Sequence, residues 1–382
     1  MTSTSARAIA EDCAGSSQQC ADRQVPQRSD RIQAMGMQID VYTKREKFDQ
    51  LRDEWNSLLQ RSASDTVFMT CEWQQVWWEH LGPKGDDLLS LITVRDESEE
   101  LVGLWPLYDE SPGPLPRRLR IIGSPRGSDY LDLIARRGQE RAVYKTMLDF
   151  LAWWGEWESI EVDNIRAGSP TLEVLAPLAE EQGLEVQIDP LTVCPGIALS
   201  ESWEVYLARL GRKQRHEIRR KLRRAEQGMD QVKWYLSDDP QTLAQDMEVY
   251  FELFQKSSHV KEDYMDEQRQ RFNQAMAWGM LKAGWLHLAF LTVNGEKVAS
   301  MFCFNYRRAI SLYNSGFDPQ RYPRLSPGIV LLFYCIQDAI ERGYPLFDFL
   351  RGDEEYKYRF GAVDRVIHRL TISRWQGTAR CT

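Results

Sequence analysis

The segment FDFLRGDEEYKYRFG, residues 347–361, carries a dense set of groups able to move protons or to hold phosphate. An apolar stretch stops at Arg351 and is followed by acids, tyrosines and further bases. A carboxylate here could take a proton from an incoming nucleophile, and a tyrosine could give one to a leaving group. The candidate base is Asp348 or Asp353, and the candidate acid is Tyr356. A salt-bridged surface loop is the alternative interpretation.

Other side chains are expected at the same site, because ligands of open α/β sheets bind at the carboxyl ends of strands. Tyr313, in an upstream strand, is expected to face this cleft. Asp129 and Tyr130, in GSPRGSDYLDLI, are expected to line it from the first half of the chain, although turn chemistry explains them equally well. The predicted substrate-binding residues are Arg351, Glu354, Lys357, Asp129 and Tyr130.

A second candidate site lies at the start of the stretch SPGIVLLFYCIQDAIERG, residues 326–343. This stretch predicts a helix with Ser326 as its N-cap, Pro327 in the first turn and Gly343 at its C-terminal end. Unpaired N–H groups at a helix start, reinforced by the helix dipole, can bind an anion. The predicted cofactor-binding residues are Arg321, Arg324, Ser326, Pro327 and Gly328. A plainly capped helix with solvated arginines is the alternative.

The most biased segment is LARLGRKQRHEIRRKLRRAEQ, residues 207–227. Its apolar residues recur at helical spacing, which predicts an amphipathic basic helix over residues 203–227. Such a face could hold the phosphates of a nucleotide, an RNA backbone, an anionic lipid surface or an acidic protein. A solvated helix that packs on the acidic remainder of the molecule is equally consistent with the pattern.

The elements that must position these residues follow the same order in both halves of the chain. In the first half, strands are predicted at 37–43, 88–94, 101–107 and 159–165, extended pieces at 118–122 and 130–134, and helices at 44–61, 71–82 and 140–154. In the second half, strands at 285–293 and 297–306 meet across Asn294-Gly295, a dipeptide typical of tight hairpins, before a strand at 310–316, the helix at 326–343 and a strand at 346–350.

The order hairpin, strand, helix, strand therefore occurs twice, which predicts two similar α/β domains in tandem. The expected division is a disordered tail over 1–36, a first domain over 37–195 and a second domain over 196–382 that includes the basic helix. The tail is rich in Ser, Ala, Gln and Arg and lacks the apolar periodicity that could offset its ordering entropy.

Composition limits the remaining classes of function. The formal net charge of −8 gives nucleic acid no overall attraction, so any affinity for polyanions must be local. The longest apolar run, residues 329–336, is far shorter than the ~20 residues of a membrane span. The seven cysteines form no CxxC pair, and no signal peptide or metal-ligand spacing is recognisable. We expect a cytoplasmic protein without a metal.

Three stretches together carry a family resemblance: GRKQRHEIRRKLRRAE, SGFDPQRYPRLSPGIVLL and FDFLRGDEEYKYRFGA. They resemble the CelD-type branch of the GNAT acyltransferases, bacterial proteins with a BioF2-like acetyltransferase domain. The first-half stretches CEWQQVWWEHLG, LVGLWPL and GSDYLDLI match the same family, so the resemblance covers residue 37 to the C-terminus. The family is similar to the FemAB aminoacyl transferases, which also hold two GNAT units in tandem.

The resemblance implies a mixed α/β fold with tandem GNAT-like domains, each a mixed central sheet flanked by helices. It further implies a splayed strand pair in the second domain that admits acetyl-CoA or another acyl-CoA, with the pyrophosphate at Ser326, Pro327 and Gly328 beside Arg324. The chain lacks a clean form of the usual Arg/Gln-x-x-Gly-x-Gly/Ala phosphate loop.

The implied function is acyl transfer to an amine or hydroxyl of a polysaccharide- or cell-envelope-related acceptor. One alternative is a FemAB-like transferase that uses aminoacyl-tRNA, in which the basic helix would bind RNA. The other is a catalytically silent scaffold in exopolysaccharide or cellulose biosynthesis. The acceptor, the acyl group and the oligomeric state do not follow from the sequence.

Overall fold

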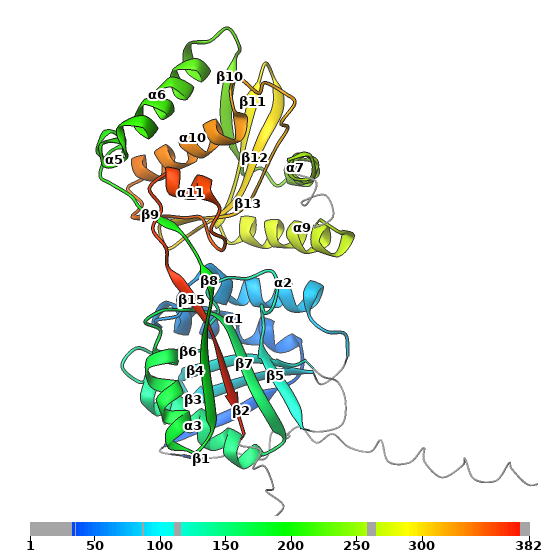
Figure 1. Cartoon of the computed structure of the whole chain (residues 1–382). Coiled ribbons are helices and arrows are strands. Elements are labelled where there is room, and N and C mark those ends of the chain that lie inside the picture. Colours follow the sequence, from blue (N-terminus) through cyan, green and yellow to red (C-terminus); the bar gives the residue numbers. More distant parts are fainter. Residues whose placement is uncertain (1–32, 35, 86–87, 111–115, 258–264, 375–382) are drawn as a thin grey trace, which may run out of the picture.

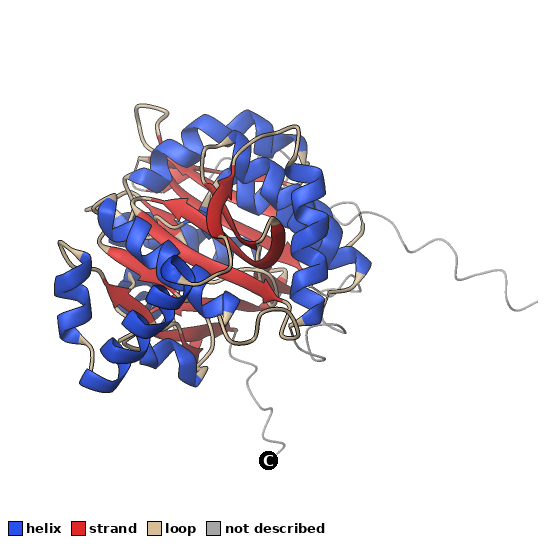
Figure 2. Ribbon diagram, turned by 90° about the horizontal axis from the view of Figure 1, so that it is seen from above, coloured by secondary structure: helices blue, strands red, loops and turns tan. Residues whose placement is uncertain are grey.

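The computed structural model describes residues 33–34, 36–85, 88–110, 116–257 and 265–374. They form two lobes, each built on one mixed β-sheet (Figure 1). Seen from above, helices lie around the sheets of both lobes (Figure 2). Of the expected disordered tail, residues 33–34 form the short strand β1, paired with β2, and the segment 1–32 lies outside the described residues.

The first sheet has the strand order β1-β2-β3-β4-β5-β7-β15-β8, with β6 paired to β4. Its strands are β1 Gln33–Ala34, β2 Met37–Tyr42, β3 Leu89–Arg95, β4 Leu101–Asp109, β5 Arg117–Ile121, β6 Ile134–Ala135, β7 Trp157–Arg166, β8 Glu185–Val193 and β15 Val366–Ser373. Its helices are α1 Glu46–Gln60, η1 Val67–Met69, α2 Cys71–Leu81, α3 Glu140–Trp154, η2 Thr171–Leu175 and α4 Ala176–Glu181. Apolar residues at helical spacing are buried in α1, which is why this segment forms a helix on the sheet.

The second sheet has the order β10-β11-β12-β13-β14-β9. Its strands are β9 Gly196–Ala198, β10 Val232–Ser237, β11 Leu286–Val293, β12 Glu296–Tyr306, β13 Ala309–Phe317 and β14 Leu346–Asp348. The helices of this half are α5 Trp203–Arg209, α6 Arg212–Gln227, α7 Leu243–Lys256, α9 Glu267–Lys282, α10 Pro327–Glu341 and α11 Glu355–Arg359. The predicted hairpin at Asn294-Gly295 is confirmed, since both residues have the positive φ angles, 53° and 85°, that such a turn requires.

The repeated order is present in both lobes and confirms the tandem α/β fold class. Each lobe has an antiparallel hairpin, β3–β4 or β11–β12, that is followed by a strand, a helix and another strand. The strands before and after the helix pair in parallel, as β5–β7 in the first lobe and β13–β14 in the second. One strand crosses from the second half of the chain to the first lobe: β15, near the end of the chain, pairs with β7 and β8 of the first sheet. The predicted domains, 37–195 and 196–382, therefore differ from the two sheets at β15, which belongs by sequence to the second domain and by pairing to the first sheet. The division into these domains stays a proposal.

One apolar core joins the two lobes. It combines residues of α1, α2 and the first sheet with residues of α7, α9, β11 and β12. Figure 1 shows α9 of the upper lobe along α2 of the lower lobe. Trp73 of α2 lies at this junction, with its ring centroid 5.1 Å from that of Phe304 and 6.2 Å from that of Phe272. Because this core is continuous, the loops that meet between the lobes are held at fixed positions.

Three predicted elements and the predicted capping bond of Ser326 differ from the structure. The basic helix over 203–227 is two helices, because Leu210 is extended and Gly211 begins a new helix. The strand at 346–350 stops at Asp348, since Leu350 has a left-handed φ of 56° that no strand accommodates. Within the extended piece at 130–134, only Ile134 belongs to a strand, β6. Ser326 does occupy the N-cap position of α10, but its side chain makes no capping hydrogen bond.

Candidate active site

The parallel strands β13 and β14 separate after a short ladder. Ala309–Ser311 pair with Leu346–Asp348, after which β14 ends while β13 continues to Phe317. Beyond this ladder, a β-bulge makes Tyr313 the extra residue of β13, because Phe302 pairs with Asn314 and Cys303 with Leu312. Bulges re-aim side chains and recur next to active sites. The predicted splayed strand pair is therefore present in the second lobe.

A cavity of about 180 Å³ lies where the two strands separate. Tyr313 and Asn314 line it from β13, and residues 349–351 line it from the chain that follows β14. The loop 127–129 of the first lobe closes it from the opposite side. The cavity is therefore assembled from both halves of the chain, and neither lobe forms it alone.

Asp129 is the carboxylate in this cavity. Its side chain is buried, Oδ1 lies 3.0 Å from Nε of Arg351, and Oδ2 accepts a hydrogen bond of 3.4 Å from the Arg351 N–H. Burial raises the pKa of Asp129 above its usual range, and the positive charge of Arg351 offsets part of that rise. A carboxylate with a raised pKa, held by one arginine in a small cavity, has the properties of a general base.

Asp348 lies just behind the cavity wall and is not among the residues that line it. Its Oδ2 accepts a hydrogen bond of 2.8 Å from the hydroxyl of Tyr130 and lies 2.8 Å from Nη2 of Arg365. Its Oδ1 accepts a hydrogen bond of 2.8 Å from the Leu350 N–H. Burial raises the pKa of Asp348, and Arg365 opposes that rise. With three partners, Asp348 is placed to hold the two lobes together.

Lys357 is buried beneath the segment that leaves β14. Its ammonium group donates hydrogen bonds to the carbonyl oxygens of Leu350, Arg351 and Gly352, at 3.2, 3.1 and 2.8 Å, and pairs with Glu354 at 2.8 Å. This satisfies carbonyls that the left-handed Leu350 turns away from any ladder. The sequence predicted Lys357 as a substrate-binding residue. In the structure its contacts hold the segment of the cavity wall that carries Arg351.

The loop 127–129 is held by partners from α2, β7 and β13. Ser128 Oγ accepts a hydrogen bond of 2.7 Å from Nε1 of Trp73, and its carbonyl accepts one of 2.9 Å from Asn164. The hydroxyl of Tyr313 donates to the carbonyl of Gly127 at 2.9 Å. Trp73 is fully buried, so its indole holds this loop from the core between the lobes.

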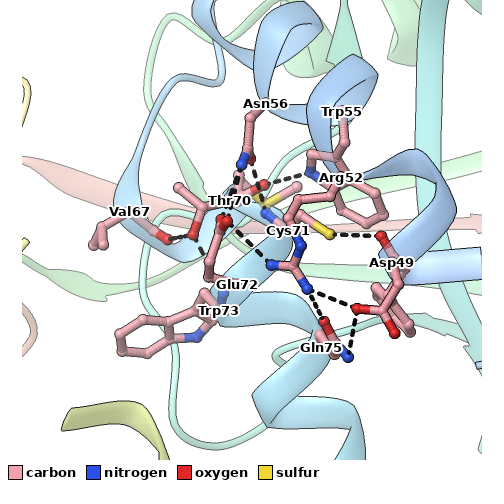
Figure 3. A network of polar contacts seen from close by, with 12 residues as sticks. Asp49, Arg52, Trp55, Asn56, Val67, Thr70, Cys71, Glu72, Trp73 and Gln75 are labelled. Carbon is pink, nitrogen blue, oxygen red and sulfur yellow. Dashed lines mark hydrogen bonds and ion pairs between the residues drawn. The ribbon is translucent and has the colours of Figure 1, made fainter. Parts of the chain in front are cut away.

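A polar network in turn fixes the start of α2 against α1 (Figure 3). Thr70 caps α2 by accepting a hydrogen bond from the Trp73 N–H. Asn56 of α1 accepts from the Cys71 N–H at 3.0 Å and donates to Glu72 at 2.9 Å, and Arg52 pairs with Glu72 at 3.1 Å. The chain of contacts runs from α1 through α2 and Trp73 to Ser128 in the cavity wall.

The predicted cofactor-binding residues lie at the start of α10, where Pro327 is buried and Gly328 packs against Phe317 at the end of β13. Lys221 of α6, a residue that the sequence reasoning did not single out, donates a hydrogen bond of 2.5 Å to Ser326 Oγ. The exposed Arg324 side chain has no partner among the described residues. Arg321, by contrast, is paired with Glu296 and lies 3.8 Å from Asp318. Arg324 is thus better placed than Arg321 to contact an anion here, and Lys221, which also lies 3.6 Å from Glu217, adds a positive charge beside Ser326.

Three predicted site residues lie apart from the cavity lining. Asp353 and Glu354 are exposed, and Glu354 contacts Lys357 only from the solvent side. Tyr356 is half-buried with its ring edge-on to Phe349, and burial raises its pKa. The residues that the structure brings together are Asp129, Tyr130, Tyr313, Asp348, Arg351 and Lys357. Ser128, Asn314 and Arg365 were missed, since no local pattern distinguishes them.

The comparisons with known proteins agree with this fold. Residues 212–358 match the family described as acetyltransferase (GNAT) domain. The crystal structure of FemX is similar over 83% of this chain and 95% of that chain, with 11% identity and a TM-score of 0.60. A conserved protein of unknown function from Bacteroides thetaiotaomicron has 12% identity over 88% of this chain and 100% of its own, with a TM-score of 0.56.

L-PGS from Bacillus licheniformis is similar over 88% of this chain and 94% of that chain, with 13% identity and a TM-score of 0.52. At these identities the likeness concerns the fold alone. No curated protein matches the chain in sequence. The comparisons support the wider GNAT group, whereas they carry no sign of the CelD-type branch.

Within the described ranges, no three His, Cys, Asp or Glu side chains are grouped in a way that could hold a metal ion. Nor does any helix in the described part of the chain combine the length and the apolar character needed to cross a bilayer.

Proposed function

We propose that this protein transfers an acyl group from acyl-CoA to an amine or hydroxyl, at the cavity where β13 and β14 separate. The observation that carries the proposal is the coincidence of two features in one place. The strands of a GNAT acyltransferase domain part there, and a buried carboxylate from the other lobe, Asp129, lines the opening. A thioester lying between the strands would present its carbonyl to this carboxylate.

The proposed chemistry is direct attack, with Asp129 as the base. Asp129 accepts the proton of the acceptor as the acceptor nitrogen or oxygen bonds to the acyl carbon, and the carbon–sulfur bond then breaks with its electron pair on sulfur. Tyr313, which lines the cavity, is the proposed proton donor to the departing sulfur. Holding both reactants in one small cavity supplies much of the barrier reduction. This assigns the base to Asp129 and leaves positioning to Asp348.

The donor diphosphate is proposed to lie at the start of α10, where the chain lacks the usual glycine-rich loop. Arg324 and Lys221 are the cations beside this position, which the family resemblance implies as the site of the acyl-CoA phosphates. The residues present therefore fit a diphosphate, with α6 adding charge that the loop sequence lacks. A polysaccharide- or cell-envelope-related acceptor stays part of the proposal.

A FemAB-like use of aminoacyl-tRNA is the second candidate, favoured by the likeness in fold to FemX across both lobes. It would require α6 to bind RNA phosphates, so its affinity would fall steeply with salt. A catalytically silent scaffold would bind neither donor.

Thermal-shift measurements with acetyl-CoA, longer acyl-CoAs, free CoA and aminoacyl-tRNA separate these candidates. A donor at ~100 times its dissociation constant stabilises the fold by ~2.7 kcal/mol. We expect CoA to stabilise the intact chain, Arg324→Gln to weaken that effect, and Arg321→Gln, whose guanidinium is already paired, to leave it unchanged. Stabilisation by aminoacyl-tRNA alone would favour the FemAB-like candidate, and stabilisation by neither would contradict the transferase proposal.

A further inference from the structure

A second and larger cavity lies away from the proposed active site. It is an open groove of about 1000 Å³ between the start of α6 and α11. Its lining consists of Arg212, Lys213, Gln214, His216 and Glu217 from α6 and Glu355 and Arg359 from α11. The chain that lines the active-site cavity at residues 349–351 continues directly into α11, so one segment contributes to both cavities.

The groove carries positive charge that the protein does not neutralise. Its two carboxylates are engaged internally: Glu217 pairs with Arg220 at 2.7 Å, and Glu355 pairs with Arg359 at 2.7 Å. Arg212 and Lys213 are exposed, and neither side chain has a hydrogen bond or ion pair with any residue that the structure describes. Two adjacent unpaired cations in a chain of net charge −8 are a local exception to its overall acidity.

The remaining cations of α6 do not extend this charge into a continuous stripe. Arg219 pairs with Glu204 at 2.6 Å, and Arg220 pairs with Glu217. Lys221 and Arg224 are bound to the segment that precedes α10, and Arg215 donates to the carbonyl of Ala208. Arg223 is also exposed and without a partner among the described residues, but it lies ten positions beyond Lys213 and outside the groove. A nucleic-acid backbone is held by a positively charged surface that follows it over several nucleotides. Free cations gathered in one groove fit a discrete anion better than a polyanion.

We propose that this groove binds a phosphate or diphosphate group, with Arg212 and Lys213 as its charged ligands and Arg359 on the opposite wall. An arginine offers two parallel N–H donors to phosphate oxygens, and a lysine offers a compact charge. A soluble phosphate ester and a lipid phosphate headgroup share this chemistry. The proposal does not depend on acyl transfer, since it concerns a groove whose lining residues are not those of the cavity.

Calorimetric titration of the full chain with inorganic pyrophosphate at low ionic strength tests this site. The variant Arg212→Gln/Lys213→Gln should weaken pyrophosphate binding at least ~10-fold, the loss expected when two charge-assisted contacts disappear. The control Arg223→Gln/Lys233→Gln removes the same charge from exposed side chains outside the groove and should bind as the intact chain does. All four positions are exposed, so melting curves should coincide.

Four outcomes would overturn the proposal. The first is that the intact chain does not bind pyrophosphate, and the second is that both double variants lose pyrophosphate binding equally. The third is that Arg324→Gln weakens pyrophosphate binding while the groove variant does not. The fourth is that the chain binds RNA, that both double variants weaken this binding, and that pyrophosphate does not displace the RNA. Vesicles of phosphatidic acid, compared with vesicles of phosphatidylcholine, identify the source. If the chain binds phosphatidic acid vesicles and only the groove variant loses that binding, the site is supported and the phosphate belongs to a lipid headgroup. If the chain binds pyrophosphate but not these vesicles, the site is supported and the phosphate belongs to a soluble ester.

Discussion

The hydroxyl of Tyr130 in the first lobe donates a hydrogen bond of 2.8 Å to Oδ2 of Asp348 in the second lobe. Each residue adjoins one wall of the cavity, Tyr130 beside Asp129 and Asp348 before the segment 349–351. Both walls contain left-handed backbone, at Tyr130 with φ 51° and at Leu350 with φ 56°. Such backbone persists only where the surroundings over-determine it. The Tyr130–Asp348 bond therefore sets the distance between the proposed base and the parted strands.

We expect Tyr130→Phe to lower both stability and transfer rate. The change removes the donor while Asp348 stays buried, which costs about 1–3 kcal/mol of unfolding free energy in denaturant titrations. Because the chain beside Asp129 loses one of its ties to the second lobe, kcat should also fall, by about tenfold.

The matched control for Tyr130→Phe is Tyr108→Phe. Tyr108 is also a buried tyrosine, but its hydroxyl donates to the Ser124 carbonyl within the first lobe. This variant should lose stability and keep its transfer rate. If both variants lose rate in proportion to stability, the bond between the lobes has no special part in positioning the site.

Asp129→Asn should remove the acid limb of the pH profile. A base must be deprotonated to act, and burial raises the pKa of Asp129, so kcat/KM of the intact protein should rise with pH through a pKa above 3.8. In the variant, kcat/KM should fall about 10²- to 10⁴-fold and lose that limb. The measurement is the initial rate of thiol release from acyl-CoA across the pH range.

Two further carboxylate variants decide between the candidate bases. Asp353→Asn changes an exposed side chain and should keep the full rate and its pH limb. Asp348→Asn should lower stability and rate together while the acid limb is retained, since it acts through position. An unchanged limb in Asp129→Asn, with the limb lost in Asp348→Asn, would return the role of base to Asp348.

The repeated order of elements and the region of the site followed from local sequence patterns. Helix α3 has the predicted bounds, 140–154, because its apolar spacing and the following Gly155 act within one segment. Residues 129, 313 and 351 were placed at one cleft because polar side chains at strand ends are visible in the sequence. The separation of β13 and β14 followed from the family resemblance.

The contacts that build the site could not be predicted in this way. Tyr130 and Asp348 are 218 positions apart, and nothing in either local pattern indicates the other. Lys357 was predicted as a substrate-binding residue, and its burial was not foreseen, because lysines are almost never fully buried unless paired. Its burial depends on carbonyls turned inward by the left-handed Leu350. The return of β15 to the first sheet likewise depends on the assembled fold.

Lys357→Met should destabilise the wall that carries Arg351. It removes the donor from the carbonyl of buried Leu350 and from the partly buried carbonyls of Arg351 and Gly352, which we expect to cost about 2–4 kcal/mol in chemical denaturation. Glu354→Gln removes only the exposed partner of the same lysine and should change stability by less than about 1 kcal/mol. Equal costs for the two variants would show that the ion pair, and not the carbonyl contacts, holds this segment.

His287 should make stability depend on pH. It is buried in β11 with no hydrogen-bond partner for Nε2 among the described residues, and burial lowers its pKa from 6.5 to about 4. The unfolded chain therefore binds a proton between pH 6.5 and 4 that the folded chain does not. The contribution of neutral His287 to the unfolding free energy is therefore fully present above pH 6.5. It is lost as the pH falls towards 4, and the loss is at most about 3 kcal/mol.

His287→Gln should flatten this dependence, because glutamine does not titrate. Unfolding free energies of the intact chain and the variant, measured by urea titration at intervals from pH 7 to pH 4, should converge as pH falls, since only the intact chain loses the histidine contribution. His216→Gln, a change at an exposed position, should run parallel to the intact chain. A difference between intact chain and His287→Gln that stays constant over this range would mean that His287 titrates alike in both states, and the burial argument would then be wrong.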